Sequence, residues 1–222
     1  MNTTKTIYQP PVNVGLDLLY CDTHLLVFNK PSGLLSVPGR GRAHRDSLTV
    51  RVQDEYPEAQ VVHRLDMDTS GLIMMARNKE AQRRLSILFQ ERRVIKHYIA
   101  LLEGHVQLDN GEVDLPLTSD WLNRPRQLVD FHGGKPSLSR YRVLARNMQT
   151  HTTRVELTPE TGRTHQLRVH MLMLGHAILG DNLYAGPVVR CRSDRLLLHA
   201  SALAFIHPVT GESMRLVSES PF

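Results

Sequence analysis

The segment His63–Gly71 carries residues whose types and spacing could do chemistry. It places a carboxylate, Asp66, in a polar turn between two extended apolar stretches, with Arg64 two positions before it. A carboxylate held in this way can act as a nucleophile. The same residue types also form ordinary turns, because Asp, Thr, Ser and Gly hydrogen-bond to the nearby backbone. The segment alone is consistent with both interpretations.

Two metal-dependent interpretations of this segment are weaker. Asp66 and Asp68 fit the start of a calcium loop, but the twelfth position is Arg77, where such a loop needs a bidentate Glu. An Asp-x-Asp pair after a strand also fits a magnesium-dependent phosphoryl-transfer site with an aspartyl nucleophile. However, His63 and Arg64 interrupt the apolar run before the pair, and no later acidic pair completes a metal site. We therefore expect no metal, and phosphoryl transfer stays as a minor alternative.

Arg168 could support a catalytic carboxylate. It lies at the edge of the apolar face of a helix predicted over residues 164–174. An arginine in that position either extends into solvent or is partly buried with a carboxylate partner. If the partner is Asp66, the guanidinium would keep the carboxylate ionised and nucleophilic at neutral pH. His165 and His170 are five residues apart, which is not the spacing of metal ligands on one helical face.

Tyr98 is a third candidate, in a strand predicted over Ile95–Leu102. A tyrosine in a strand usually packs in the core. In an RNA-modifying site its ring could instead stack on a base while its hydroxyl exchanges a proton.

The elements that must position these residues follow from hydrophobic periodicity and turn signals. Helices are predicted after Asp46 and Ser47, after Asn78, and up to Gly175. Strands are predicted over residues 16–29, 61–76, 95–102, 113–117, 138–145, 153–158, 196–206 and 214–217. The strands outnumber the helices and do not alternate regularly with them. This order favours an α+β fold with a mixed, largely antiparallel sheet.

Length and charge restrict the classes of protein that remain. The 222 residues suit one domain, expected over residues 16–222 after a polar extension at 1–15. A net charge of +5 suits a polyanionic partner such as nucleic acid. No apolar run or signal peptide predicts a membrane span or export, and the two cysteines, Cys21 and Cys191, are far apart. We expect a cytoplasmic protein, monomeric by default.

In this order, several segments resemble the RluA family of pseudouridine synthases. Each is short, but together they run from about Leu16 to the carboxyl terminus. They are Asn29–Leu34, Val37–Gly39, His63–Gly71, Lys96–Tyr98, Gly162–Arg168, Gly175–Asp181 and Leu196–Ala200. Two further segments, Asp120–Pro125 and Gly134–Pro136, are similar to the dual-specificity members of the family.

The resemblance implies a fold, an activity and roles for four residues. The fold is the pseudouridine synthase fold, a mixed sheet with flanking helices and an active cleft across its middle, here without a separate amino-terminal RNA-binding domain. The activity is isomerisation of uridines in a 23S rRNA stem-loop and in tRNA anticodon stem-loops, without cofactor or metal. Asp66 corresponds to the catalytic aspartate, Tyr98 to the active-site tyrosine, and Arg168 to the arginine paired with that aspartate. Arg64 corresponds to the arginine that enters the RNA helix in place of the flipped nucleotide.

Overall fold

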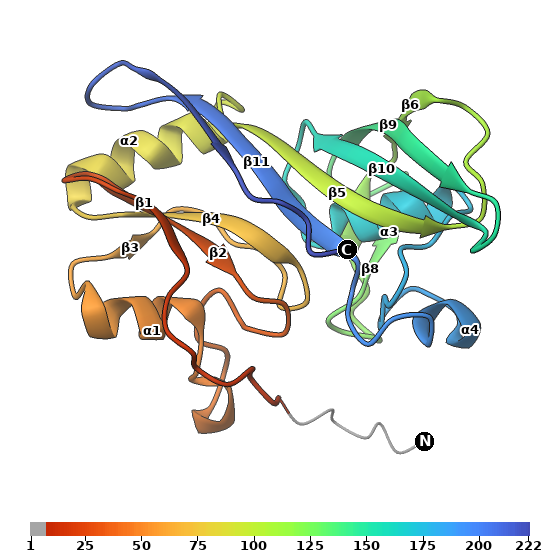
Figure 1. Ribbon diagram of the computed structural model, residues 1–222, viewed down its shortest axis with the longest axis horizontal. Coiled ribbons are helices and arrows are strands. Elements are labelled where there is room, and N and C mark those ends of the chain that lie inside the picture. The colour runs from red at the N-terminus through yellow and green to blue at the C-terminus, as the bar shows by residue number, and fades with distance from the viewer. Residues whose placement is uncertain (1–7) are drawn as a thin grey trace.

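The computed structural model of the protein describes residues 8–222, and a ten-stranded sheet crosses the whole molecule (Figure 1). Its main path has the order β1-β2-β4-β11-β5-β10-β9-β6, with β3 added to β4 and β12 added to β11. The strands are β1 Leu18–Cys21, β2 Leu25–Lys30, β3 Gln60–Val61, β4 Ser70–Ala76, β5 Ile95–Glu103, β6 Asn110–Asp114, β9 Leu138–Asn147, β10 Thr152–Pro159, β11 Leu198–Ile206 and β12 Ser213–Val217.

The predicted α+β architecture is confirmed, because the sheet is antiparallel except where β4 and β11 run parallel. That parallel contact is short and pairs only His199 with Ser70 and Ala200 with Gly71. The two halves of the sheet therefore join through one narrow junction, visible near the middle of Figure 1.

The longer helices begin and end where local sequence signals place them. Helix α1, Leu48–Glu55, is capped by the Ser47 side chain, which accepts a hydrogen bond from the Val50 amide. Helix α2, Lys79–Gln90, is capped in the same way by Asn78. Helix α3, Gln166–Met173, is followed by Gly175 at a positive φ of 91°, as expected for a glycine stop. The remaining helical turns are a 3₁₀ turn at Arg42–His44 and α4 at Pro187–Arg190.

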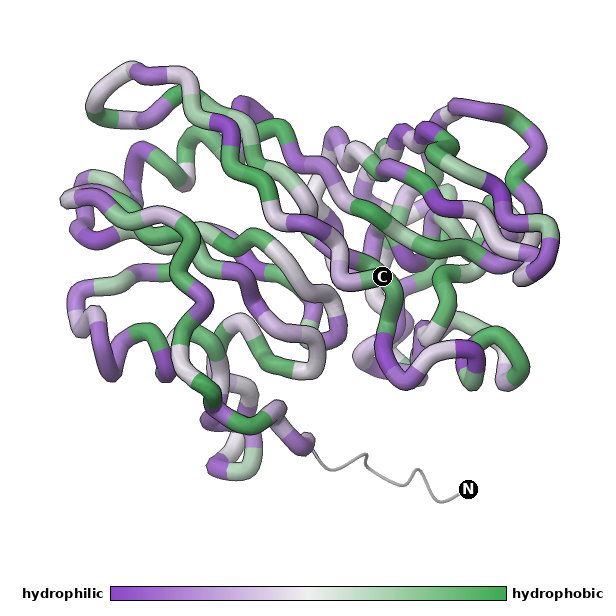
Figure 2. Tube along the Cα trace, in the orientation of Figure 1, coloured by the Kyte–Doolittle hydropathy of each residue, from purple (hydrophilic) through white to green (hydrophobic). Residues whose placement is uncertain are grey.

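Apolar side chains form a separate core on each side of the junction. Buried residues of β5, β10 and α3 make one core, while β2, β4 and α2 make another. Figure 2 shows green, hydrophobic stretches along the central strands and mostly purple or white residues in the turns. Tyr98 contacts two of the clusters, so it lies where the halves meet.

Two parts of the chain differ from the expectations. The strand predicted over residues 113–117 is divided: β6 ends at Asp114, and β7, Leu117–Ser119, starts a separate two-stranded sheet with β8, Gln127–Val129. Neither β8 nor α4 has a strong periodic signal, because both elements are only a few residues long.

Of the predicted extension at 1–15, residues 1–7 lie outside the described residues, and Tyr8 hydrogen-bonds to the main chain of Asp46. Over residues 8–222, none of the helices has the length and apolar character needed to cross a membrane.

Candidate active site

The parallel junction brings Asp66 and Tyr98 into one neighbourhood. On adjacent strands, Tyr98 of β5 is opposite Ala200 of β11, and Ala200 is opposite Gly71 of β4. Neighbouring strands are about 4.8 Å apart, so Tyr98 and Gly71 lie about 10 Å apart across the row. Asp66 is in the turn that leads into β4. The pKa of Tyr98 is raised by burial and, to a smaller extent, by the charge of the Asp66 carboxylate, so the two side chains are near each other.

A glycine is required at this junction. Gly71 has a φ of +106°, and a Cβ there would lie 2.3 Å from the Ala200 carbonyl oxygen and 2.6 Å from its nitrogen. Such distances are far below van der Waals contact, so only a residue without a side chain lets β4 approach β11 this closely. The sequence pattern treated this glycine as a turn residue; its role in strand packing appears only in three dimensions.

A buried lysine holds the turn that carries Asp66 in place. Lys30 is at the end of β2, and its ammonium donates to the carbonyl oxygens of Pro31 at 2.8 Å, Leu34 at 2.8 Å and Met67 at 2.9 Å. Burial lowers the pKa of Lys30 to about 7, against the opposing attraction of Asp68 and Asp66. The contact with Met67, next to Asp66, ties the turn to β2.

Arg168 is fully buried, but its carboxylate partner is not the one expected. The guanidinium forms a two-pronged salt bridge with Asp181, with Nε–Oδ2 at 2.8 Å and Nη2–Oδ1 at 2.6 Å, and it also bonds Asn182. Both charged side chains are almost inaccessible, at 2% for Arg168 and 1% for Asp181. The predicted direct pairing of Arg168 with Asp66 is therefore corrected. Asp181 is the salt-bridge partner that holds the arginine in place, and Asp66 interacts with it only through its charge.

The charge of Asp66 is felt by several buried groups. For Arg168, burial lowers the pKa, but Asp181, Asp66 and Asp68 outweigh it and the net shift is upward. Burial is also the main reason why the pKa of Tyr98 is raised, and the Asp66 charge adds to it. Tyr98 is therefore neutral at physiological pH and Arg168 is charged, an arrangement that offers a hydroxyl and a cation beside one carboxylate.

Behind the junction, a buried hydrogen-bond chain joins β4 to β11. Arg195 donates to Ser70 Oγ, which is 2.8 Å from His199 Nδ1, and His199 Nε2 is 3.1 Å from Ser218 Oγ. In the neutral tautomer of His199 that carries its proton on Nε2, the ring donates to Ser218 and its Nδ1 accepts from the Ser70 hydroxyl, which in turn accepts from Arg195. Burial lowers the pKa of His199 to about 4, which agrees with that neutral form.

An open cleft of about 770 Å³ lies next to this site. It borders the turn that carries Asp66 through Asp68 and reaches Asn182, which bonds Arg168. Its lining combines the turn after β2 with the segment around α4: Pro31, Ser32, Gly33, Asp68, Gly180, Asn182, Arg190, Cys191, Ser193, Asp194, Arg195 and Leu196. Two arginines, Arg190 and Arg195, line the cleft together with two aspartates, Asp68 and Asp194, so it offers cations for phosphate groups without a net charge of its own.

Arg64, the fourth predicted residue, is exposed, two residues before Asp66. Within residues 8–222 its guanidinium has no salt bridge, so it is free to reach a bound molecule. His63, next to it, has a packing role. Its Nε2 accepts the Met74 amide at 2.9 Å, its ring stacks on Phe89, and burial lowers its pKa to about 3.

Sequence reasoning missed the roles of Lys30, Asp181 and Tyr184. Asp181 accepts the backbone amides of Leu183 and Tyr184 in addition to Arg168. Tyr184 bonds His165 at 2.7 Å, and its ring lies 5.3 Å from the Arg168 guanidinium. The signal for Asp181 was the Gly-Asp pair after a buried segment, and the signal for Lys30 was a charged residue ending an apolar strand; neither identifies a partner.

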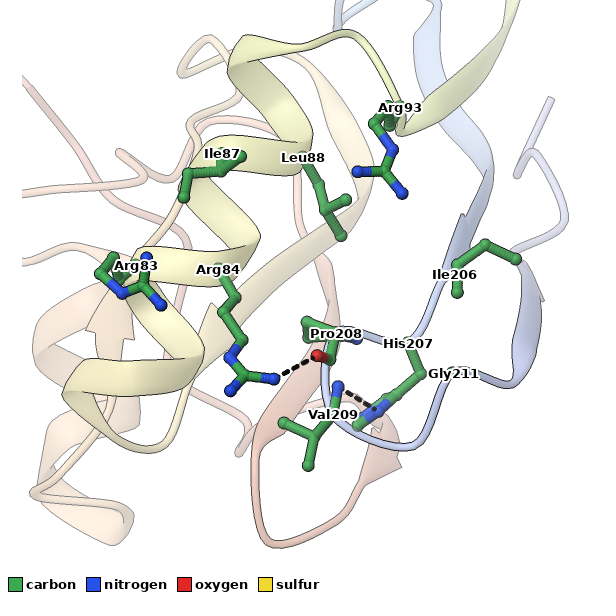
Figure 3. Close-up of a pocket in the computed structure, with 10 residues that line it drawn as sticks. All are labelled: Arg83, Arg84, Ile87, Leu88, Arg93, Ile206, His207, Pro208, Val209 and Gly211. Atoms are coloured by element: carbon green, nitrogen blue, oxygen red, sulfur yellow. Dashed lines mark hydrogen bonds between the residues drawn. The ribbon is translucent and has the colours of Figure 1, made fainter.

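A second cavity, of about 370 Å³, lies elsewhere, between α2 and the β11–β12 hairpin (Figure 3). Its Arg83 and Arg84 are paired with Glu80, and Arg93 is paired with Glu91. No candidate catalytic residue lines it. Within residues 8–222, no group of three or more His, Cys, Asp or Glu side chains could hold a metal ion.

Comparisons with known proteins identify the family of this chain. A family profile described as RNA pseudouridylate synthase matches residues 24–173. The dual-specificity RNA pseudouridine synthase RluA of Pasteurella multocida is 55% identical over 92% of this chain and 93% of its own length. The protein of the same name from Escherichia coli K12 is 51% identical over 97% of this chain and 98% of its own.

A solved structure extends the likeness to the fold. Human RNA Pseudouridylate Synthase Domain Containing 1 superposes with a TM-score of 0.80 at 32% identity, covering 96% of this chain and 87% of that one. The profile covers more than half of the chain, and the bacterial relatives span nearly all of it. The chain therefore belongs to the RNA pseudouridylate synthase family, in its RluA branch.

Proposed function

We propose that this enzyme isomerises uridines in a 23S rRNA stem-loop and in tRNA anticodon stem-loops, with Asp66 as the catalytic carboxylate. The observation that carries the proposal is the convergence of Asp66, a neutral Tyr98 and a buried, charged Arg168 near one strand junction, with an open cleft beside it. The relatives named dual-specificity RNA pseudouridine synthases support two classes of RNA substrate.

The chemistry needs no external reactant. Asp66 acts at the ribose while the bond from uracil N1 to the ribose C1′ breaks. The freed uracil turns, and its C5 forms the new bond to C1′. C5 then loses its proton, and N1 carries a proton in the product, so atoms and charge balance.

Each neighbour of Asp66 has a defined part in this scheme. Tyr98 packs against the base and offers its hydroxyl for proton transfer. Arg168, fixed by Asp181, places a positive charge near the Asp66 carboxylate. Arg64 enters the RNA where the flipped uridine leaves, offsetting part of an unstacking cost of about a few kcal/mol. We place this activity in the cytoplasm, in a monomer without cofactor.

The test is tritium release from RNA labelled at uracil C5, measured in the presence of a chelator. We expect release from a tRNA anticodon stem-loop and from a 23S rRNA stem-loop without any addition. A requirement for magnesium would favour the phosphoryl-transfer alternative and reject this proposal.

Asp66→Asn identifies the catalytic group in the same assay. An amide is nearly isosteric with the carboxylate but cannot act as a nucleophile, so turnover should fall by several orders of magnitude. RNA affinity should stay within a few-fold. Asp68→Asn, two residues away in the same turn, is the matched control and should retain most of the rate. Residual activity of Asp66→Asn above about a hundredth of the wild-type rate contradicts the assignment.

A further inference from the structure

The β7–β8 hairpin presents the chain's single tryptophan to solvent, and the proposed chemistry does not use it. Trp121 is 72% exposed and Leu122 is 95% exposed. Adjacent large apolar side chains that are exposed at a loop tip are candidates for contact with a partner. The guanidinium of Arg124 lies over the Trp121 ring, 3.4 Å from its centroid. The tip thus combines an aromatic plane with a cation.

The tip is an ordered turn. Asp120 accepts the Asn123 amide at 3.1 Å and the Asn123 side chain at 2.9 Å. The main chain closes the turn, with Asp120 N to Arg126 O at 2.9 Å and Arg126 N to Asn123 O at 3.0 Å. A ring on such a turn is held in place before any ligand arrives, so less conformational entropy is lost on binding.

The base of the hairpin is anchored to residues that surround Asp66. Leu117 of β7 packs in one buried cluster with Val169 of α3 and Tyr184. The Tyr184 hydroxyl accepts the Gln127 amide at 2.8 Å, and the Tyr184 ring lies 5.3 Å from the Arg168 guanidinium and 5.4 Å from that of Arg126. Figure 1 shows β8 beneath β5 and close to α3. The hairpin therefore packs against the residues that surround Arg168.

The chemistry of the tip selects its partner. Arg124 and Arg126 are exposed, and the acidic group of the turn, Asp120, is already bound to Asn123. A positive aromatic surface suits an unpaired base on a phosphate backbone, since bases stack on aromatic rings and on guanidinium planes. A purely apolar protein contact would gain nothing from these arginines.

We infer that Trp121 and Arg124 form a stacking platform for one unpaired base of the substrate RNA, outside the uridine that enters the active site. This inference rests on the proposed RNA substrates. It gives the hairpin a role in substrate affinity and in the choice of RNA loop.

The single tryptophan makes a direct test possible, because the intrinsic tryptophan emission of the protein comes from this hairpin alone. The full chain carrying Asp66→Asn is titrated with a tRNA anticodon stem-loop and with a 23S rRNA stem-loop. Each RNA carries a terminal dye, so that anisotropy measures binding independently. We expect binding to quench Trp121 emission and to reduce its accessibility to acrylamide. In a set of stem-loops with one abasic loop nucleotide each, one position should lose the quenching.

Trp121→Ala should raise the Kd by about tenfold, as expected for one lost base stack, whereas Trp121→Phe should raise it by less. Arg124→Ala should weaken binding and also lower the salt slope by about one unit if it contacts a phosphate. Met148→Ala is the control, because Met148 is similarly exposed on the turn between β9 and β10 and should leave the Kd unchanged. The exposure of Trp121 keeps its replacement from disturbing the core, and thermal unfolding checks this.

Binding without a change in Trp121 emission, together with wild-type affinity for Trp121→Ala, overturns the inference. If the wild-type enzyme still releases tritium from the same RNA, the proposed function survives that result. Failure to bind either RNA, with no tritium release, overturns both.

Discussion

At the scale of single residues, the site is a set of buried polar groups that control one another's protonation. Arg168 and Asp181 neutralise each other's charge and are almost inaccessible to solvent. The ammonium group of Lys30 donates hydrogen bonds to three carbonyl oxygens. Removing one partner of such a pair leaves a buried charge unmatched, which is costly. The residues that contact substrate in the proposed mechanism are more accessible, so substitutions there report on chemistry with less effect on stability.

Tyr98→Phe separates stacking from proton transfer. The ring is kept and the hydroxyl is lost, so RNA affinity should survive while the single-turnover rate falls by about 10²- to 10⁴-fold. Tyr141→Phe is the control, since Tyr141 is a buried tyrosine that lies two strands away in the same row, across Leu157. An unchanged rate for Tyr98→Phe excludes a proton-transfer role for its hydroxyl.

Arg64→Ala distinguishes a role in base flipping from simple binding of the RNA phosphate backbone. If Arg64 fills the space left by the flipped uridine, its loss should slow modification most in a folded stem-loop. An RNA whose target base is already unpaired should recover part of the rate. Single-turnover rates on both RNAs, at several salt concentrations, make the measurement. Arg215→Ala, on the exposed strand β12, is the control.

A phosphate contact by Arg64 predicts a different pattern. Both RNAs would then lose the same factor, and the salt slope would fall by about one unit. That result would assign Arg64 to backbone binding and remove it from the flipping step.

At the scale of elements, the parallel contact between β4 and β11 sets the position of the Asp66 turn. It pairs only two residues on each strand, and the Ser70–His199 hydrogen bond lies at the same point. The halves on either side have their own cores, so small changes at this contact should move Asp66 relative to Tyr98.

Gly71→Ala tests this contact. The added methyl would meet the Ala200 main chain at 2.3 Å, and the φ of +106° is unfavourable for alanine. We expect a loss of about 3 kcal/mol in the free energy of unfolding, measured with urea, and a reduced turnover in the folded protein. Gly175→Ala shares a positive φ but has open space around it, so it should cost only about 1 kcal/mol. Equal losses in the two variants would mean that the close approach of the strands is unimportant.

At the scale of the whole molecule, buried neutral histidines make stability depend on pH. Burial lowers the pKa of His199 to about 4 and that of His63 to about 3. In the unfolded chain a histidine titrates near 6.5. Between these values the unfolded state binds more protons than the native state, so stability must fall as pH decreases below about 6.5.

We expect His199 alone to remove about 2 kcal/mol of stability between pH 7.5 and pH 5. Urea unfolding of wild type and His199→Asn at both pH values measures this, and the variant should show a smaller difference between them. The exposed His132→Asn should retain the wild-type difference. If His199→Asn also retains it, His199 is not the group responsible.

Local patterns in the sequence were sufficient for the helices and most strands. Ser47 and Asn78 cap helices because a short polar side chain reaches amides three residues ahead, which is a property of local sequence. Apolar alternation likewise located β5 and β10. The β7–β8 hairpin was not predicted, because its strands are three residues long and its stability comes from packing on α3 and Tyr184.

The order of residues in the chain also singled out Asp66, Tyr98, Arg168 and Arg64, through motifs that resemble a known family. The tertiary structure decided which of these residues interact and which other residues hold them in place. Asp181 is the partner of Arg168, Lys30 holds the Asp66 turn, and Gly71 allows two strands to touch; Lys30 and Gly71 are far in sequence from the residues that they contact. Burial and distance across a sheet determine the strength of a charge interaction, and neither quantity exists until strands from both halves of the chain have paired.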